Sequence, residues 1–232
     1  MSRAADIINF LEGLSVTRTD LPQGIQLVNP HQQNPEVMQT VRLFYQKYYG
    51  DGDPRILILG INPGRLGAGM TGIPFTDPKR LVSVLDLPYS GKVTHEPSSV
   101  FIYDMITAYG GPEKFYKAFY IGSLFPLTIV KYGNDGKFKN YNYYDDAVLL
   151  GKLRLPIVDN IKLQLEISGS PGSCICLGTG RNAQVLRRLN NQYHFFERIE
   201  VLEHPRFIAQ YQHKNRQAYI EKYVRVLNEI QG

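Results

Sequence analysis

The stretch RILILGINPGRLGAGMTGIPF, from Arg55 to Phe75, decides the fold that we expect for this chain. Residues 56–61 are all Ile or Leu except Gly60 and show no polar alternation, which is typical of a parallel strand buried on both faces. Open α/β sheets bind ligands outside the carboxyl ends of such strands. The Asn62-Pro63-Gly64 break that follows is therefore expected to open a binding loop.

The loop also contains Gly67, Gly69 and Gly72, which match the spacing of a dinucleotide-binding fingerprint. A true fingerprint begins at the strand end and opens a helix, whereas Pro74 follows here two residues after the last glycine. No Gly-Lys-Ser/Thr triplet follows either, which argues against a phosphate-binding P-loop. A nucleotide-binding or cofactor-binding α/β protein stays open as an alternative, as does a tight surface loop that only needs glycine geometry.

Three more apolar runs predict strands, at 120–126, 173–177 and 199–202, and each is followed by Pro, Gly or His-Pro. Helical patterns fill the intervals between the strands. The alternation predicts a three-layer α/β/α sandwich with a central, mainly parallel four-stranded sheet, in a single domain spanning 1–232. Asn62, Ser123 and His204 follow or end three of these strands, so we expect them to meet at one edge of the sheet.

Two local features refine this interpretation. Residues 128–142, with Asn134-Asp135-Gly136 at their centre, predict a β-hairpin. Asp145-Asp146 predict the start of a helix, which Pro156 is expected to break and restart.

The charge balance favours a polyanionic partner. The chain has 26 Lys and Arg against 21 Asp and Glu, and its pI is about 9.1. The balance is equally compatible with a mildly basic enzyme that never meets nucleic acid. The N-terminal residues lack the apolar core of a signal peptide, and no segment reaches the roughly 18 apolar residues of a membrane span. We therefore expect a cytoplasmic protein with no membrane partner.

The two cysteines, Cys174 and Cys176, lie on the same face of the expected strand at 173–177. We predict that both are core thiols. No further Cys or His cluster completes the four ligands that a structural zinc requires, so no metal site is expected.

The sequence from Asn62 to Phe75 resembles, without a gap, the first motif of the SMUG-like branch of the uracil-DNA glycosylase superfamily, the single-strand-selective monofunctional enzymes. That motif has Asn-Pro-Gly, a middle Gly, and then Thr-Gly-x-Pro-Phe. The superfamily's second motif is a His-Pro pair at the end of the last strand, and His204-Pro205 matches it.

The resemblance implies a monofunctional DNA glycosylase of base excision repair. Such an enzyme hydrolyses the N-glycosidic bond of uracil, and of related deaminated or oxidised bases, after the nucleotide is flipped out of DNA. It would act as a monomer without metal or cofactor. Some branches of the superfamily hold an iron–sulfur cluster, but that needs four cysteines and this chain has two. A relative that keeps the fold and has lost catalysis is a third hypothesis.

The resemblance also implies roles for single residues. Asn62 would hold the attacking water and His204 would stabilise the departing base, while Phe75 would stack on the flipped base. An amide cannot accept the proton as a carboxylate would, so we expect the rate to depend mainly on stabilisation of the leaving base. The remaining base contacts are expected from Ser123 and from the backbone N–H groups of Gly64, Arg65 and Leu66.

Two departures from the family pattern affect specificity and DNA binding. SMUG-like enzymes carry an Asn where this chain has Ser123, and a rotatable hydroxyl predicts looser base selectivity. They also place a second proline and an arginine soon after the His-Pro pair, in a loop that wedges into the duplex. Here Arg206, Phe207 and Tyr211 are the wedge candidates, and the sequence does not choose among them. His213, Lys214 and Arg216 are expected to meet phosphates or to form a solvated helix face.

Overall fold

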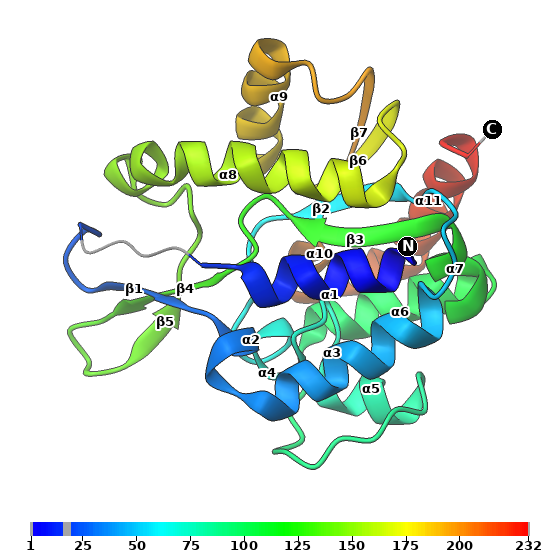
Figure 1. Cartoon of the computed structure of the whole chain (residues 1–232), viewed down its shortest axis with the longest axis horizontal. Coiled ribbons are helices and arrows are strands. Elements are labelled where there is room, and N and C mark those ends of the chain that lie inside the picture. The colour runs from blue at the N-terminus through cyan, green and yellow to red at the C-terminus, as the bar shows by residue number, and fades with distance from the viewer. Residues whose placement is uncertain (1, 16–19, 232) are drawn as a thin grey trace.

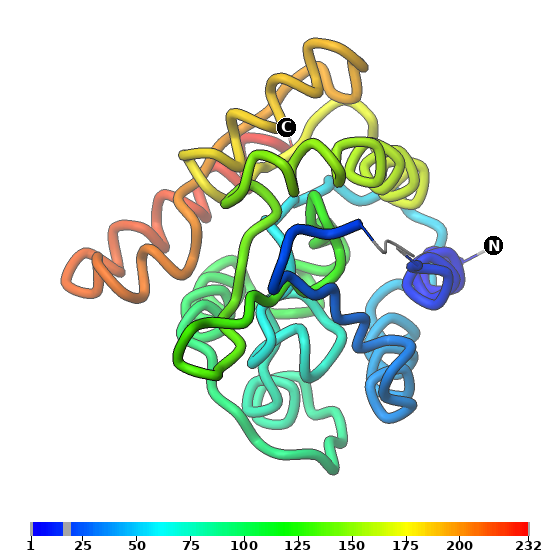
Figure 2. The backbone as a smooth tube through the Cα atoms, turned by 90° about the vertical axis from the view of Figure 1, so that its left-hand side faces the viewer, coloured from blue at the N-terminus to red at the C-terminus, as the bar shows by residue number. Residues whose placement is uncertain are grey.

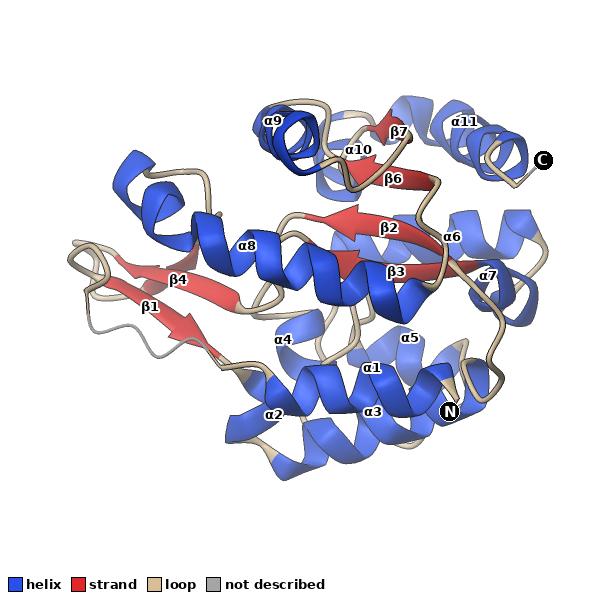
Figure 3. Cartoon of the chain, turned by 45° about the horizontal axis from the view of Figure 1, so that its top comes forward, coloured by secondary structure: helices blue, strands red, loops and turns tan. Residues whose placement is uncertain are grey.

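The computed structural model describes residues 2–15 and 20–231, and a four-stranded parallel sheet runs through its centre (Figures 1 and 3). The strands lie in the order β3-β2-β6-β7, which brings together segments far apart in the sequence. Their bounds are β2 Ile56–Gly60, β3 Phe119–Ser123, β6 Ser173–Leu177 and β7 Arg198–Leu202. Leu57, Ile58 and Leu59 of β2 are buried, as the uninterrupted apolar run predicted.

Helices cover both faces of this sheet. The helices α8 and α9 lie on one side, whereas α6, α10 and α11 lie on the other (Figure 3). The bounds are α1 Arg3–Gly13, α2 Pro30–Gln33, α3 Pro35–Tyr48, α4 Ala68–Thr71, α5 Pro78–Ser83, α6 Pro97–Tyr109, α7 Pro112–Ala118, α8 Ala147–Ser168, α9 Arg181–Tyr193, α10 Pro205–Tyr211 and α11 Arg216–Glu229. A 3-10 turn, η1 His213–Asn215, separates the last two. The predicted three-layer α/β/α architecture is confirmed.

A second, antiparallel sheet projects from one side of the molecule (Figure 1). The hairpin predicted over 128–142 forms its strands β4 Thr128–Tyr132 and β5 Phe138–Asn140. The third strand, β1 Ile25–Val28, pairs with β4 and was not predicted from the sequence. A four-residue strand with only one fully buried side chain has almost no local pattern, and its partner lies about a hundred residues further along the chain.

The prediction that Pro156 breaks and restarts a helix was wrong, because α8 continues through it. A proline inside a helix removes one hydrogen bond and costs about 3 kcal/mol or more. Burying one large aliphatic side chain contributes about 1.5–3 kcal/mol. Four side chains at four-residue spacing are fully buried on both sides of the proline, and together they outweigh its cost: Leu149, Leu153, Ile157 and Ile161.

The second predicted strand is also shorter than expected, because β3 ends at Ser123 rather than at Pro126. Leu124 and Phe125 donate N–H bonds to Gly60 and Ile61, so they still follow the neighbouring strand as the chain turns away. Cys174 and Cys176 are buried in β6, and burial raises the pKa of both thiols, as expected of core cysteines. No described helix has the length and apolarity that crossing a membrane requires.

Candidate active site

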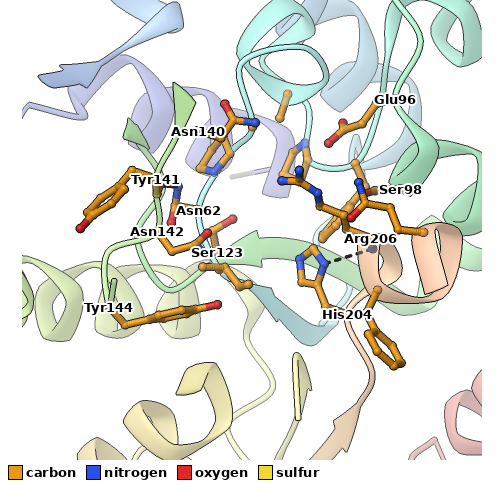
Figure 4. Close-up of a pocket in the computed structure, with 18 of the residues that line it drawn as sticks. Asn62, Glu96, Ser98, Ser123, Asn140, Tyr141, Asn142, Tyr144, His204 and Arg206 are labelled. Atoms are coloured by element: carbon orange, nitrogen blue, oxygen red, sulfur yellow. Dashed lines mark hydrogen bonds between the residues drawn. The ribbon is translucent and has the colours of Figure 1, made fainter. Parts of the chain in front are cut away.

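A pocket of about 290 Å³ opens at the carboxyl edge of the parallel sheet (Figure 4). Asn62 follows β2, Ser123 ends β3, and His204 follows β7 by two residues. All three line the pocket together with Phe75. The convergence expected from three separate strand ends is therefore present in the structure.

The Asn62 amide is held at both of its ends by the segment that follows β5. Its Nδ2 donates to the Tyr141 carbonyl at 3.0 Å, and its Oδ1 accepts from the Tyr143 N–H at 3.2 Å. Both partners are backbone groups, so they fix which end of the amide is oxygen and which is nitrogen. A carbonyl oxygen has two lone pairs, so Oδ1 keeps one acceptor position for a further ligand.

His204 begins α10, and its side chain caps that helix. Nδ1 accepts a hydrogen bond from the Arg206 N–H at 3.2 Å (Figure 4). An accepting Nδ1 carries no proton, so the neutral ring carries its proton on Nε2. Burial, and secondly the positive charge of Arg206, lowers the pKa of His204 to about 4. The imidazole is therefore neutral near pH 7 and presents an N–H donor.

Phe75 is held in an unusual backbone conformation beside His204. Its φ is 52°, in the left-handed region that aromatic residues rarely adopt. The Thr71 hydroxyl donates to the Thr76 carbonyl at 2.6 Å, which closes the turn around Phe75. The centroids of the Phe75 and His204 rings lie 5.7 Å apart. The edge of the Phe75 ring also lies close to Gly60, because a Cβ added at Gly60 would be 3.2 Å from that ring. The strand end and the loop together fix the position of the ring.

Ser123 is fixed through its backbone rather than through its side chain. Gln164 of α8 accepts from the Ser123 N–H at 3.2 Å and donates to the Ser123 carbonyl at 2.9 Å. The Ser123 hydroxyl makes no hydrogen bond to any other residue that the structure describes, although Ser123 is only 6% exposed. The hydroxyl of this pocket residue is therefore available to a ligand.

Glu96 is a pocket residue that the sequence did not reveal. Its N–H donates to the fully buried Asp77 carboxylate at 2.7 Å, and its carboxyl lies against Gly64 and Gly67 of the loop. Burial and the neighbouring Asp77 raise the pKa of Glu96 to about 7, against the opposing charge of Arg206. Figure 4 places Glu96 on the Arg206 side of the pocket, opposite Asn62. Its only signal in the sequence is its position before Pro97, at a helix start.

The hairpin also contributes lining residues that the sequence analysis missed, namely Asn140, Tyr141, Asn142 and the nearby Tyr144. A repeated Asn-Tyr pattern marks this segment, but nothing local indicates that it meets the loop after β2.

The glycines of the loop let it fold back on itself. The Gly69 N–H donates to the Gly64 carbonyl at 2.9 Å, and a Cβ at Gly69 would meet that same carbonyl oxygen at 2.9 Å. Of the three backbone donors predicted to contact the base, the Arg65 N–H is engaged by the Asn140 side chain at 3.2 Å. Gly64 lines the pocket, whereas Arg65 and Leu66 are exposed and do not.

The predicted DNA-binding residues divide into two groups. Arg206, Phe207 and Tyr211 of α10 line the mouth of the pocket, with Phe207 40% and Tyr211 73% exposed. The two rings lie 5.8 Å apart. His213, Lys214 and Arg216 lie beyond the pocket, where Arg216 forms an ion pair with Asp104.

Comparison with known proteins agrees with this geometry. The sequence profile of the uracil DNA glycosylase superfamily matches residues 47–228. The crystal structure of wild-type SMUG2 from Pedobacter heparinus matches with a TM-score of 0.97 and 50% sequence identity, over 100% of this chain and 99% of that chain. A comparison with curated proteins gave no match. A nucleotide-binding or cofactor-binding protein is not favoured, and the chain belongs to the uracil DNA glycosylase superfamily as a SMUG-like member.

Proposed function

We propose that this chain removes uracil from DNA as a monofunctional glycosylase, with Asn62 and His204 as its catalytic residues. The observation that carries this proposal is the meeting of Asn62, Phe75, Ser123 and His204 in one pocket at the sheet edge. The full-length likeness to wild-type SMUG2 from Pedobacter heparinus supports the same reaction. The target base leaves the stack and enters the pocket, because its glycosidic bond is inaccessible inside a helix.

His204 stabilises the leaving base. Cleavage of the N-glycosidic bond places negative charge on the departing pyrimidine, and a donor aimed at that charge lowers the barrier. The neutral imidazole donates through Nε2–H, since Nδ1 is occupied by the Arg206 N–H. Because the donor is already fixed by α10, little reorganisation accompanies the reaction.

Asn62 positions the attacking water through the free lone pair of Oδ1. The Tyr141 and Tyr143 backbone groups hold the amide in place, so the water is oriented without any movement of the side chain. An amide does not accept a proton, and the carboxyl of Glu96 lies across the pocket. The glycosidic C–N bond therefore breaks first, and the water adds to a sugar that already has oxocarbenium character. The proton that the water loses goes to the departed base anion or to solvent.

Phe75 stacks on the flipped base and Ser123 contacts its polar edge, with the Gly64 backbone beside it. The Ser123 hydroxyl rotates, so it serves several hydrogen-bond patterns and rejects none strongly. We expect activity on uracil and on related deaminated or oxidised bases, among them a 5-substituted uracil or a deaminated purine.

The DNA lies across the pocket mouth, where Arg206, Phe207 and Tyr211 provide one charged and two aromatic contacts, and either ring is suited to wedge into the stack. His213 and Lys214 meet phosphates outside the mouth, and Arg216 does so if its pair with Asp104 opens. The protein works as a monomer, in a single domain spanning 1–232, in the cytoplasm with access to the chromosome. One continuous hydrophobic core and the full-length match support the single domain.

The deciding experiment is cleavage of a uracil-containing oligonucleotide, followed by alkali at the abasic site. Strand scission only after alkali treatment is expected of a monofunctional glycosylase. A panel of otherwise identical strands with uracil, hydroxymethyluracil, hypoxanthine, xanthine or cytosine then measures selectivity. No released base from any strand would favour the inactive DNA-binding relative. Strict uracil-only activity, with a Ser123→Ala loss as large as that of His204→Ala, would contradict the looser selectivity.

A further inference from the structure

The β4–β5 hairpin carries an exposed aromatic pair that the catalytic residues do not use. Tyr132 is 53% exposed and Phe138 is 36% exposed, and their ring centroids lie 5.1 Å apart. The base of the hairpin is buried at Thr128, Ile129 and Val130, whereas β5 is exposed along its whole length. The aromatic pair therefore stands on a projecting arm that the core does not cover.

The register of the hairpin points this pair to the same face as a pocket residue. Tyr132 pairs with Phe138, and Val130 pairs with Asn140. Side chains two residues apart share a face of a strand, so Phe138 lies on the face of Asn140. Asn140 lines the pocket and bonds to the Arg65 N–H at 3.2 Å. Two residues of a strand span about 7 Å, and about two nucleotides of a DNA strand cover the same distance at about 3.4 Å each.

The charges of the arm suit the same ligand. Between Lys131 and Asn140 the chain has three lysines, Lys131, Lys137 and Lys139, against one acidic residue, Asp135. Lys131 lies over the Tyr141 ring at 5.0 Å, and Lys139 forms an exposed ion pair with Asp135 at 2.9 Å. Lys131 pairs with Lys139, and each is one residue from the aromatic pair, so both lysines lie on the other face of the hairpin. Exposed aromatic rings on a positively charged arm are a combination with which proteins hold unpaired nucleic acid.

The arm and α10 lie on different sides of the pocket. Figure 2, seen from the side of the hairpin, shows the hairpin in green and α10 in orange at separate places on that face. Both contribute lining residues, Asn140 from the hairpin and Arg206 from α10. A strand whose flipped nucleotide occupies the pocket therefore passes α10 on one side and the hairpin on the other.

We propose that the hairpin binds unpaired nucleotides on one side of the flipped base, with Tyr132 and Phe138 stacking on bases and the net positive charge of the arm attracting the phosphates. This proposal rests on the proposed glycosylase function, since it places the flipped nucleotide in the pocket. Stacking requires exposed base faces, so the surface acts on single-stranded DNA and has less effect on a duplex.

The test is the double variant Tyr132→Val with Phe138→Val, which keeps residues suited to strands and removes both rings. We expect its affinity for a single-stranded oligonucleotide, measured by fluorescence anisotropy, to fall about 10-fold to 100-fold. The excision rate at saturating enzyme should stay near that of the wild type, because neither ring lines the pocket. Leu155→Ala removes a 64% exposed apolar side chain of α8, outside both surfaces, and is the matched control.

A truncation series locates the contact. Substrates shortened nucleotide by nucleotide on either side of the uracil should show one side whose removal weakens wild-type binding and leaves the double variant unaffected. Equal affinity of the double variant and the wild type for the full-length strand would overturn the proposal. So would a loss of affinity in the double variant that persists when the strand is shortened on both sides of the uracil. Phe138→Leu keeps an apolar cross-strand contact, and it replaces the double variant in the same assays if thermal unfolding shows that variant to be unstable.

Uracil-free strands separate this proposal from the glycosylase function. If the hairpin binds unpaired nucleotides, the double variant should also bind uracil-free strands more weakly than the wild type does, whether or not the protein excises any base. A wild-type protein that releases no uracil, while binding such strands through the hairpin, would refute the glycosylase function alone.

Discussion

Removal of His204 gives the most direct test of the mechanism. The ring accepts the Arg206 N–H at 3.2 Å on Nδ1, so its Nε2–H is the donor that faces the pocket. Loss of one donor of this kind costs about 100-fold to 1,000-fold in rate, or about 2.7–4 kcal/mol of transition-state stabilisation. We expect that loss for His204→Ala, with DNA affinity close to that of the wild type, because the interaction strengthens only as the base departs. His204→Asn keeps an N–H donor and should lose less.

The pH dependence of the same residue follows from its pKa of about 4. Only the neutral imidazole accepts the Arg206 N–H on Nδ1 while it donates through Nε2–H. This neutral form predominates at pH values above the pKa. A histidine with an ordinary pKa of 6.5 would already be mostly charged at pH 5.5. His204 should instead stay neutral there and acquire its proton only as the pH falls through 4. The contribution of His204 to the rate is therefore expected to be constant from pH 8 down to pH 5.5.

Single-turnover excision of uracil, measured from pH 5 to pH 8, gives both the rate loss of His204→Ala and the pH dependence of the wild-type rate. His194→Asn is the control, since this exposed histidine lies outside the pocket at a φ of 53°, which Asn tolerates. A His204→Ala rate within about fivefold of the wild type would refute the role of the donor, which requires at least about 100-fold. A wild-type transition near pH 6.5 that disappears in His204→Asn would refute the neutral ring.

Three further predictions concern other residues of the site. Asn62→Ala should slow single-turnover excision by about 100-fold or more while binding DNA nearly as well as the wild type; unchanged excision would exclude Asn62 from the reaction. Glu96→Gln should stabilise the fold at pH 8 and leave it unchanged at pH 4. The raised pKa of about 7 means that the folded state holds a proton that the unfolded state releases above pH 4.5, so wild-type stability falls between these two values. At pH 8 the free energies of unfolding of Glu96→Gln and of the wild type should differ by at most about 3 kcal/mol. Denaturant unfolding of both proteins at pH 4 and pH 8 measures this difference. Equal stability of the two proteins at pH 8 would contradict the raised pKa. Gly60→Ala should displace the Phe75 ring, which would lie 3.2 Å from the new Cβ, and slow excision about 10-fold with little change in thermal stability. Wild-type excision by this variant would show that the ring position is not critical.

The sequence by itself determined the parts of this protein that depend on local pattern. The apolar run ahead of Asn62 predicted a buried parallel strand and a binding loop at its end. The motif from Asn62 to Phe75 and the His204-Pro205 pair indicated the family. These signals are short and contiguous, because a strand needs its own apolar residues and a tight loop needs its own glycines.

Only the tertiary structure decided the properties that depend on partners far along the chain. The Asn62 amide is oriented by Tyr141 and Tyr143, which are 79 and 81 residues away. Glu96 has its raised pKa because folding buries it beside Asp77. Pro156 stays inside a helix since the side chains around it are buried by the sheet. Burial and long-range hydrogen bonds are set by how the elements pack, and no local sequence pattern encodes that packing.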